Sequence, residues 1–271
     1  MIQKISIIIA VYNKARNLRY LLAAFARQSF KEFEVIIADD GSGKEIADVV
    51  NETKRTYPFR IKHLWHADKG WRKNTMLNYG LQESTTDYII FLDGDCLPGK
   101  DFVLDHFIHR EKGKALLGRR VEHSERWAEN LSLTKIVNGE FEKYTMMDLI
   151  DGVTGKSITL ESGFRITNNT IRALTGKAKS ILGCNFSTYK EHLIAINGFD
   201  EEYRGPGCGE DSDIFYRLNL IGVTGKSLRN LAIQYHLWHP LTEPKEENYK
   251  RFLEVQRNNN PICKNGIKKL R

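Results

Sequence analysis

Two aspartates one residue apart follow an apolar run near the middle of the chain. The stretch FLDGDCLPG begins at Phe91, and its carboxylates belong to Asp93 and Asp95. A turn accounts for either acid alone, since Asp and Gly are common turn residues. A divalent cation accounts for both, because Mg²⁺ and Mn²⁺ prefer oxygen ligands, typically carboxylates together with substrate phosphates. The spacing therefore indicates metal-assisted chemistry as an alternative to a plain turn.

A second acidic stretch, DDGS, follows an earlier apolar run. Asp39 and Asp40 can form a tight turn with no further role. A carboxylate at the end of a strand can also accept a hydrogen bond from a nucleobase N–H or a ribose hydroxyl. The chain has no G-x-x-x-x-G-K-[ST] and no G-x-G-x-x-G after its first apolar run, which disfavours P-loop enzymes and nicotinamide dehydrogenases.

A third acidic stretch, CGEDSDIFYRL, starts a predicted helix, where the helix dipole stabilises negative charge. Asp213 and Arg217 lie four residues apart and are expected to form a structural ion pair. Glu210 and Asp211 are left at the junction between a glycine-rich loop and the helix, from which a carboxylate can reach a cleft. A carboxylate placed there can act as a general base, a role typically worth about 10²–10⁴ in rate.

Two histidines lie three residues apart in the stretch YHLWHP, at the end of a strand-like pattern. A lone histidine in such a place is usually structural. Because the chain already offers a carboxylate pair, one of His236 and His239 is a candidate metal ligand, and the spacing does not decide which. Trp238, between them, can pack against the fold or stack on a sugar.

The elements that must position these residues alternate along the first half of the chain. Helical periodicity is expected around residues 18–25, 46–50 and 72–83, with Asn13 as a cap of the first helix. The alternation predicts a mostly parallel sheet with right-handed crossovers, in which ligands bind beyond the carboxyl ends of the strands. The acidic stretches sit at those ends. The predicted strands cover residues 4–11, 33–38, 60–65 and 87–92.

The pattern weakens from about Arg119 to Lys179. This stretch is mostly polar, with helix-like pieces around 125–144 and a part rich in Gly, Ser, Thr and Asn afterwards. It is interpreted as an insertion, a flap or a partner-binding surface. Further on, residues 231–239 form a strand-like run, and a helix from Glu246 precedes the basic tail KNGIKKLR.

Composition is that of an ordinary globular protein of 271 residues. Lys and Arg outnumber Asp and Glu by 41 to 34, a net charge of +7, which suits anionic partners such as nucleotides, nucleic acid or an acidic membrane surface. No apolar run approaches the ~20 residues of a membrane span, and the start does not match a signal peptide. The expected location is the cytoplasm, either free or at the inner membrane surface. Four scattered cysteines agree with a reduced compartment: Cys96, Cys184, Cys208 and Cys263.

Taken in order, these motifs resemble the inverting family-2 glycosyltransferases of the GT-A fold. SIIIAVYN, FEVIIADDGS, DKGWRKNTMLNYG and DYIIFLDGDC resemble the nucleotide-binding half, including its metal-binding D-x-D. NFSTYKEHLIAINGFDEEYRGPGCGEDSDIFYRL is similar to the acceptor-side segment of chondroitin-polymerase-type and β-1,4-galactosyltransferase-type enzymes. Residues 119–179 match no motif of the family.

The resemblance implies an α/β architecture: a Rossmann-like, mostly parallel central sheet flanked by helices, with a helical or irregular insertion. All 271 residues would form a single glycosyltransferase domain. Its parts would be a nucleotide-sugar-binding half over 1–118, the insertion or flap over 119–179, an acceptor and catalytic half over 180–245, and a C-terminal helix with a basic tail over 246–271.

The resemblance also implies roles by position. Asp211 would be the catalytic base and Glu210 a contact of the acceptor hydroxyl. Asp95 would bind Mn²⁺ or Mg²⁺, with either His236 or His239 completing the metal site. The residues implied on the nucleotide-sugar side are Tyr12, Asp39, Asp40, Asp68, Arg72 and Asp93. The residues implied in sugar stacking are Trp71 and Trp238.

Within the nucleotide-sugar group the resemblance separates the tasks further. Asp40 would contact the uracil or ribose, with Asp39 as a second candidate. Tyr12 and Asp68 would line the same pocket. Arg72 would lie near the diphosphate, and Asp93 would lie near the ribose and the metal.

The expected reaction moves a hexosyl or N-acetylhexosaminyl group from a nucleoside diphosphate sugar, expected to be a UDP-sugar, to a glycan or lipid-linked glycan. It would invert configuration in one displacement and serve polysaccharide or glycoconjugate synthesis. Peripheral membrane contact through the basic tail is expected, and nucleic acid is not an expected partner. One alternative is a sugar nucleotidyltransferase, which would need a basic glycine-rich loop that IAVYNKARNL lacks. Another is a non-catalytic binder of anionic polymer or membrane, which leaves the acids at strand ends unexplained.

Overall fold

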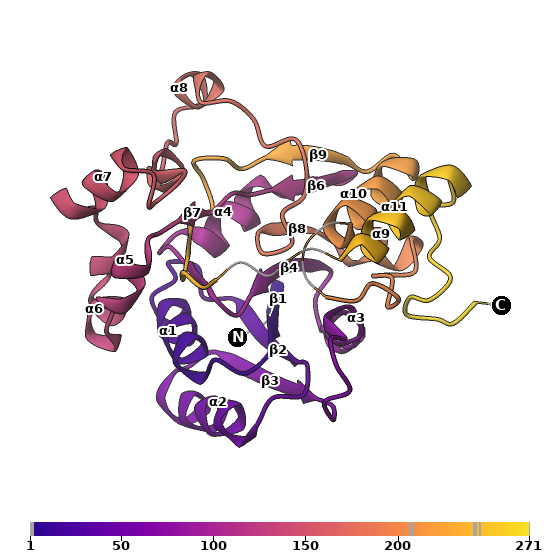
Figure 1. Cartoon of the computed structure of the whole chain (residues 1–271), viewed down its shortest axis with the longest axis horizontal. Helices are drawn as coiled ribbons and strands as arrows, with labels where there is room; N and C mark the ends of the chain where they lie inside the picture. The colour runs from indigo at the N-terminus through magenta and orange to yellow at the C-terminus, as the bar shows by residue number, and fades with distance from the viewer. Residues whose placement is uncertain (1–2, 206, 208, 241–242, 244, 271) are drawn as a thin grey trace.

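A seven-stranded sheet forms the centre of the computed structural model (Figure 1). The structure describes residues 3–205, 207, 209–240, 243 and 245–270, so Cys208 and the final arginine lie outside it. All neighbouring strands pair in parallel except the fifth of the sheet, which runs antiparallel to both neighbours. The mostly parallel sheet is thus confirmed. From edge to edge its strands are β3 (Arg60–Trp65), β2 (Phe33–Asp39), β1 (Ile5–Val11), β4 (Tyr88–Asp93), β8 (Phe186–Tyr189), β6 (Lys114–Leu117) and β9 (Thr224–Ser227).

Helices cover both faces of this sheet. In β1, Ile7 and Ile9 belong to one apolar core and Ile8 to the other, because successive side chains of a strand point to opposite faces. Burial on both faces explains why the first strands read as unbroken apolar runs. The first core includes side chains of α1 (Ala15–Ala26), α2 (Lys44–Thr56) and α4 (Phe102–His109), and the second includes those of α3 (Lys73–Glu83), α9 (Lys190–Ala195) and α10 (Glu210–Leu220).

A close approach between α3 and β1 depends on a glycine. A Cβ at Gly80 would lie 2.7 Å from Cγ2 of Ile8, so any larger residue would push the helix off the sheet. The first helix begins differently from the prediction. Asn13 does not cap it, because its side chain accepts a hydrogen bond from the backbone of Gly43 (3.3 Å), and Lys14 precedes the helix without a side-chain cap.

A second, three-stranded sheet brings the end of the DGDC stretch beside His236. Its order is β5 (Cys96–Pro98), β10 (Gln234–His236) and β7 (Val121–Glu122). The register sets His236 beside Cys96 on one side and Glu122 on the other. The strand predicted over 231–239 is much shorter, and on its N-terminal side the positive φ of Ala232 (43°) interrupts the extended backbone.

The stretch 119–179 leaves the sheet after β6 and contains β7 and several short helices. It is anchored by Arg165, whose guanidinium donates two hydrogen bonds to Asp105 on α4 (2.9 and 2.6 Å). This agrees with the helical and irregular insertion that was expected. Its elements are α5 (Glu125–Glu129), α6 (Leu133–Asn138), η1 (Glu140–Glu142), α7 (Met146–Val153), η2 (Leu160–Gly163) and α8 (Asn169–Leu174).

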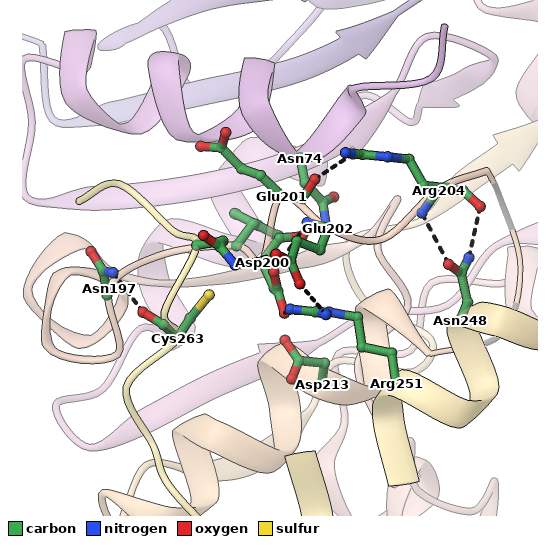
Figure 2. A network of polar contacts seen from close by, with 12 residues as sticks. Asn74, Asn197, Asp200, Glu201, Glu202, Arg204, Asp213, Asn248, Arg251 and Cys263 are labelled. Carbon is green, nitrogen blue, oxygen red and sulfur yellow. Dashed lines mark hydrogen bonds and ion pairs between the residues drawn. The ribbon is translucent and has the colours of Figure 1, made fainter. Parts of the chain in front are cut away.

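The C-terminal helix α11 (Glu246–Asn258) and the tail are fastened by a polar network (Figure 2). Arg251 donates to Asp200 (2.7 Å), and Asn248 exchanges hydrogen bonds with the backbone of Arg204 (2.9 and 3.1 Å). Asn197 donates to the carbonyl of Cys263 (2.7 Å). Within the described residues, no helix has both the length and the apolar character that a membrane span requires.

Candidate active site

A cavity of about 560 Å³ opens beyond the carboxyl ends of β1, β2 and β4. Its volume lies within the range of small-molecule and cofactor sites. The cavity also touches the start of α10 and the backbone around Gly183, so it is shared by the two halves of the chain. The predicted site residues that line it are Tyr12, Asp40, Trp71, Asp93, Asp95, Glu210, Asp211, His236 and His239.

The two acids of DGD face different partners in this cavity. Asp93 Oδ1 lies 2.7 Å from Nζ of Lys73, whereas both oxygens of Asp95 face the histidine pair. Gly94 between them donates its N–H to the carbonyl of Ala10 (2.8 Å). The chain thus turns at Gly94 and Asp95 between β4 and β5, and the two carboxylates face different clusters.

Asp95 lies between the two histidines. Its Oδ1 is 3.8 Å from Nε2 of His236, and its Oδ2 is 3.3 Å from Nε2 of His239. Burial would raise the pKa of Asp95, but the hydrogen bond with His239 and the charges of His236 and Lys14 outweigh it and hold that pKa well below its usual range. Both histidines face the same carboxylate, so the geometry keeps both as candidate ligands.

The outer nitrogens of the histidines have partners of their own. His236 Nδ1 lies 2.7 Å from Oε2 of Glu122, and His239 Nδ1 lies 2.9 Å from the carbonyl of Pro240. Such outer contacts orient metal-binding imidazoles in proteins and leave Nε2 toward the ion. Asp95, Cys96 and His236 offer ligand atoms within 4.8 Å of one another, a spacing that can hold a divalent cation such as Mn²⁺. The thiol of Cys96 lies close by, but burial raises its pKa, so it is a poor ligand for a hard ion.

Glu210 and Asp211 start α10 at the opposite side of the cavity. The N–H of Gly183 donates a 2.6 Å hydrogen bond to Oδ2 of Asp211. Burial raises the pKa of Asp211, while the charge of Lys73 opposes that shift. Burial and the neighbouring Asp211 raise the pKa of Glu210 to about 7. Oε2 of Glu210 is buried and has no hydrogen-bond partner within the described residues, as expected of a group that awaits a ligand.

Lys73 is a site residue that the sequence did not single out. It lies between Asp93 and the two acids of α10, whose charges outweigh burial and raise its pKa. Arg72, the neighbour expected near the diphosphate, turns away: its guanidinium donates to the carbonyl of Ala67 (2.5 Å). The sequence alone does not distinguish Arg72 from Lys73, because the exact start of α3 decides which of the two side chains faces the cavity.

The insertion contributes a second group that was not anticipated. Arg120 lines the cavity and its Nε lies 2.6 Å from Oε1 of Glu122, the residue that contacts His236. Cys184, also on the cavity wall, accepts a hydrogen bond from Nη1 of Arg120 (3.5 Å). Arg120 and Glu122 lie at the start of the stretch 119–179, which matched no motif, so no sequence signal pointed to them.

The remaining predicted residues do not line the main cavity. Asp39 is fully buried and accepts hydrogen bonds from the N–H of Ser42 (2.9 Å) and from His63 (2.8 Å), so it shapes the turn instead of facing a ligand. Asp68 accepts a hydrogen bond from the hydroxyl of Tyr12 (2.9 Å) at the rim. Trp238 borders a separate cavity of about 120 Å³. Asp40, by contrast, does line the main cavity. Its carboxylate is hydrogen-bonded to His66 and to the backbone N–H of Arg72.

Comparisons with known proteins show that the chain is an enzyme of the glycosyltransferase class with the GT-A fold. Residues 6–169 match the family model described as glycosyl transferase family 2, and residues 172–240 match the one described as the N-terminal domain of galactosyltransferase. The first match covers more than half of the chain, which therefore belongs to glycosyl transferase family 2.

Characterised relatives agree with this class. Chondroitin synthase from Escherichia coli is 28% identical over 245 residues, which cover 87% of this chain and 35% of that protein. Validoxylamine A glucosyltransferase from Streptomyces hygroscopicus subsp. jinggangensis (strain 5008) is 27% identical over 226 residues, covering 81% of this chain and 52% of that protein. The chain thus spans about a third of the first relative and about half of the second. Both names favour glycosyl transfer over nucleotidyl transfer or simple binding.

Solved structures show the same fold at low identity. S. aureus TarS 1–349 in complex with UDP has a TM-score of 0.60 and 18% identity, with 95% of this chain and 65% of that chain covered. Mannosyltransferase PcManGT from Pyrobaculum calidifontis, in complex with GDP-Man and Mn²⁺, has a TM-score of 0.59 and 13% identity, covering 96% and 70%. These similarities confirm the architecture expected from the sequence.

Proposed function

We propose that this chain is a metal-dependent, inverting glycosyltransferase. It moves a hexosyl or N-acetylhexosaminyl group from a nucleoside diphosphate sugar to a glycan or lipid-linked glycan acceptor, as a step in polysaccharide or glycoconjugate synthesis. One observation carries the proposal: a single cavity is bordered by Asp40, by Asp95 with its histidines, and by Asp211. These are the parts that donor recognition, diphosphate departure and acceptor activation each require.

On the donor side, Asp40 and Tyr12 face the nucleoside and Trp71 the sugar. The hydrogen bonds of Asp40 with His66 and with the backbone N–H of Arg72 fix its carboxylate in a position to accept from a uracil N–H or a ribose hydroxyl. We take the donor to be a UDP-sugar. The resemblance of the motifs supports this choice, and TarS, one structure of the same fold, is solved in complex with UDP.

Asp95, His236 and His239 would hold Mn²⁺ or Mg²⁺. A divalent cation bound there would stabilise the negative charge of the departing nucleoside diphosphate as a Lewis acid. Asp93 holds the ammonium of Lys73 beside the same space, where a fixed positive charge favours the departing diphosphate. The cavity thus offers cationic groups where negative charge develops.

Asp211 would act as general base. It takes the proton of the acceptor hydroxyl while that oxygen forms a bond to the anomeric carbon, and the bond from that carbon to the diphosphate oxygen breaks on the opposite face. Configuration is inverted in one displacement, and no covalent nucleophile is required. Glu210, whose Oε2 is without a described partner, would contact the acceptor hydroxyl and orient it.

We place the reaction in the cytoplasm or at the inner face of the membrane. The cysteines Cys96, Cys184 and Cys263 are free thiols buried in the fold, which fits a reducing compartment. The partners are the nucleotide-sugar donor and the glycan acceptor, without nucleic acid.

A donor screen tests this function. Thermal shift and nucleotide release are measured across UDP-, GDP- and dTDP-sugars, each with and without Mn²⁺. The proposal expects stabilisation by UDP-sugars that depends on the metal, and release of UDP only when a glycan acceptor is added. Stabilisation by a nucleoside triphosphate with release of pyrophosphate would favour a nucleotidyltransferase, and no stabilisation by any nucleotide would refute the proposal.

A further inference from the structure

Helix α7 exposes its apolar side chains and buries its acidic ones, the reverse of the usual arrangement. Met146 is 73% exposed and Val153 is 90% exposed, while Asp148 and Asp151 are buried. A helix on a soluble surface normally turns its apolar stripe inward and its acids to water. The arrangement therefore leaves an apolar face unpartnered within the described residues.

Polar contacts fix α7 in this orientation. Asp151 accepts hydrogen bonds from Oγ of Ser124 (2.6 Å) and Nε of Arg126 (3.0 Å). Asp148 accepts one from Nη2 of Arg126 (3.0 Å) and forms a capping box with Thr145. Because both acids are held from the inner side, the helix cannot rotate its apolar side chains inward without breaking these bonds. The exposure is thus built into the fold.

Two further apolar side chains of the insertion are exposed. Phe164 is 53% exposed, and Leu174 on α8 is 85% exposed. Figure 1 shows both helices standing away from the central sheet, α7 at the left edge of the view and α8 at its top. Exposed apolar groups that gather in this way mark protein or membrane contacts. We name this region the α7–α8 surface and define it by Met146, Leu149, Ile150, Val153, Phe164 and Leu174, all exposed.

Exposed charge within the stretch 143–179 is mostly positive. The lysines at 143, 156, 177 and 179 are all exposed, and none forms an ion pair within the described residues. Between residues 143 and 179 the one exposed acid is Glu161, which is paired with Arg229 (2.8 Å). Exposed apolar side chains and unpaired lysines in one stretch are complementary to an anionic lipid surface.

We propose that the α7–α8 surface docks on an anionic membrane. The apolar side chains enter the boundary between headgroups and acyl chains, and the lysines lie against anionic headgroups. A second copy of the chain fits less well, because it would bring two sets of like charges together. The insertion begins beside Arg120 and ends before Gly183, both of which line the cavity, so docking would hold the cavity near the lipid surface.

The membrane contact proposed here lies away from the C-terminal tail. The backbone N–H of Ile267 donates to Asn197 (2.9 Å), and its side chain packs against the second apolar core. Lys269 is paired with Glu201 (2.8 Å). The tail is thus fastened to the body of the protein, and part of its charge is already neutralised.

Flotation of the full chain with lipid vesicles tests the proposal without any transfer assay. Vesicles of phosphatidylcholine with and without phosphatidylglycerol are compared at low and high salt. The wild-type protein is expected to float with the phosphatidylglycerol vesicles at low salt and to lose most binding at high salt. Val153→Glu and Leu174→Glu should each lower the bound fraction by about tenfold. Ile194→Glu, at an exposed position on α9, and Lys268→Glu on the tail are matched controls that should bind as the wild type.

A fluorescence measurement tests membrane contact without relying on the folding of the glutamate variants. Val153→Trp should shift its emission to the blue when anionic vesicles are added, and Ile194→Trp should not. The proposal is overturned if the wild type does not float, if Val153→Glu and Leu174→Glu float normally, or if the controls lose binding equally. It is also overturned if light scattering shows a dimer that Val153→Glu converts to a monomer, because the surface would then serve a second copy.

Discussion

Nζ of Lys73 lies 2.7 Å from Oδ1 of Asp93, so the residue that starts α3 is tied to the first acid of the DGD stretch. The same ammonium is attracted by the charges of Glu210 and Asp211. It therefore stands between the donor side and the acceptor side of the cavity. This contact gives Asp93 a task different from that of Asp95.

Lys73→Met should lower kcat by roughly 10²–10³, because a preorganised positive charge beside the departing diphosphate is removed. The pKa of Asp211 should also rise, since the charge of Lys73 opposes the effect of burial, and the rising limb of the pH–rate profile should move to higher pH. Steady-state rates across pH measure both effects. Lys69→Met, at an exposed neighbouring position, is the control and should leave both unchanged. An unshifted profile for Lys73→Met would remove the coupling to Asp211.

Gly183→Ala should impair transfer more than donor binding. A Cβ at this position would lie 2.2 Å from Oδ1 of Asp211, so the carboxylate must move and its hydrogen bond to the backbone N–H is lost. We expect kcat to fall by about tenfold or more, with the affinity for UDP nearly unchanged. Ser180→Ala, exposed in the same segment, should keep full activity. Wild-type kcat in Gly183→Ala would show that the position of Asp211 does not matter.

Glu122→Gln should weaken metal binding, because Glu122 orients His236 through its Nδ1. Loss of such an outer partner typically costs about 10–100-fold in metal affinity. Titration of Mn²⁺ followed by electron paramagnetic resonance gives the affinity without any turnover. Glu125→Gln on the exposed side of α5 is the matched control. Equal Mn²⁺ affinity in both variants and the wild type would place the ion elsewhere.

Glu210 should make the fold less stable at alkaline pH. The pKa of Glu210 is raised to about 7, by burial first and by Asp211 second, so between its ordinary pKa and about 7 the native state holds more protons than the unfolded state. The free energy of unfolding contributed by this group therefore falls as pH rises through that window and stays low above it. Glu210→Gln removes the buried charge.

Melting curves at two pH values test this sign. Glu210→Gln should melt higher than the wild type by about 5 °C near pH 8 and equally near pH 4, where the wild-type carboxyl is protonated. Glu254→Gln, at an exposed position on α11, supplies the control. A Glu210→Gln protein that is less stable than the wild type near pH 8 would contradict a buried, destabilised carboxylate.

The first half of the fold was predictable because its strands are buried on both faces. Ile7, Ile8 and Ile9 serve two cores at once, and such strands have an unmistakable apolar pattern. The acids at strand ends were predictable for the same reason, since the carboxyl edge of a parallel sheet gathers whatever follows each strand. The histidine pair reaches this edge through a three-residue strand, whose partners no local pattern specifies.

The insertion was expected, but the orientation of its helices was not predictable, and α7 shows why. Its acids Asp148 and Asp151 are inside and its apolar residues are outside, so a pattern argument assigns the wrong face to the core. Glu122 belongs to a two-residue strand, too short to leave a period in the sequence. Lys73 was missed because only the exact start of α3 separates it from Arg72. These contacts depend on tertiary structure rather than on spacing.

The role of Asp211 as the base is the central claim, and the kinetics of Asp211→Asn test it most directly. The asparagine keeps the size of the side chain and can still accept the hydrogen bond from Gly183, so the fold and the affinity for UDP-sugar with Mn²⁺, measured by calorimetry, should stay near those of the wild type. The rate of transfer to the glycan acceptor should fall by about 10²–10⁴ or more. A folded Asp211→Asn protein that binds donor and turns over at the wild-type rate would contradict the account.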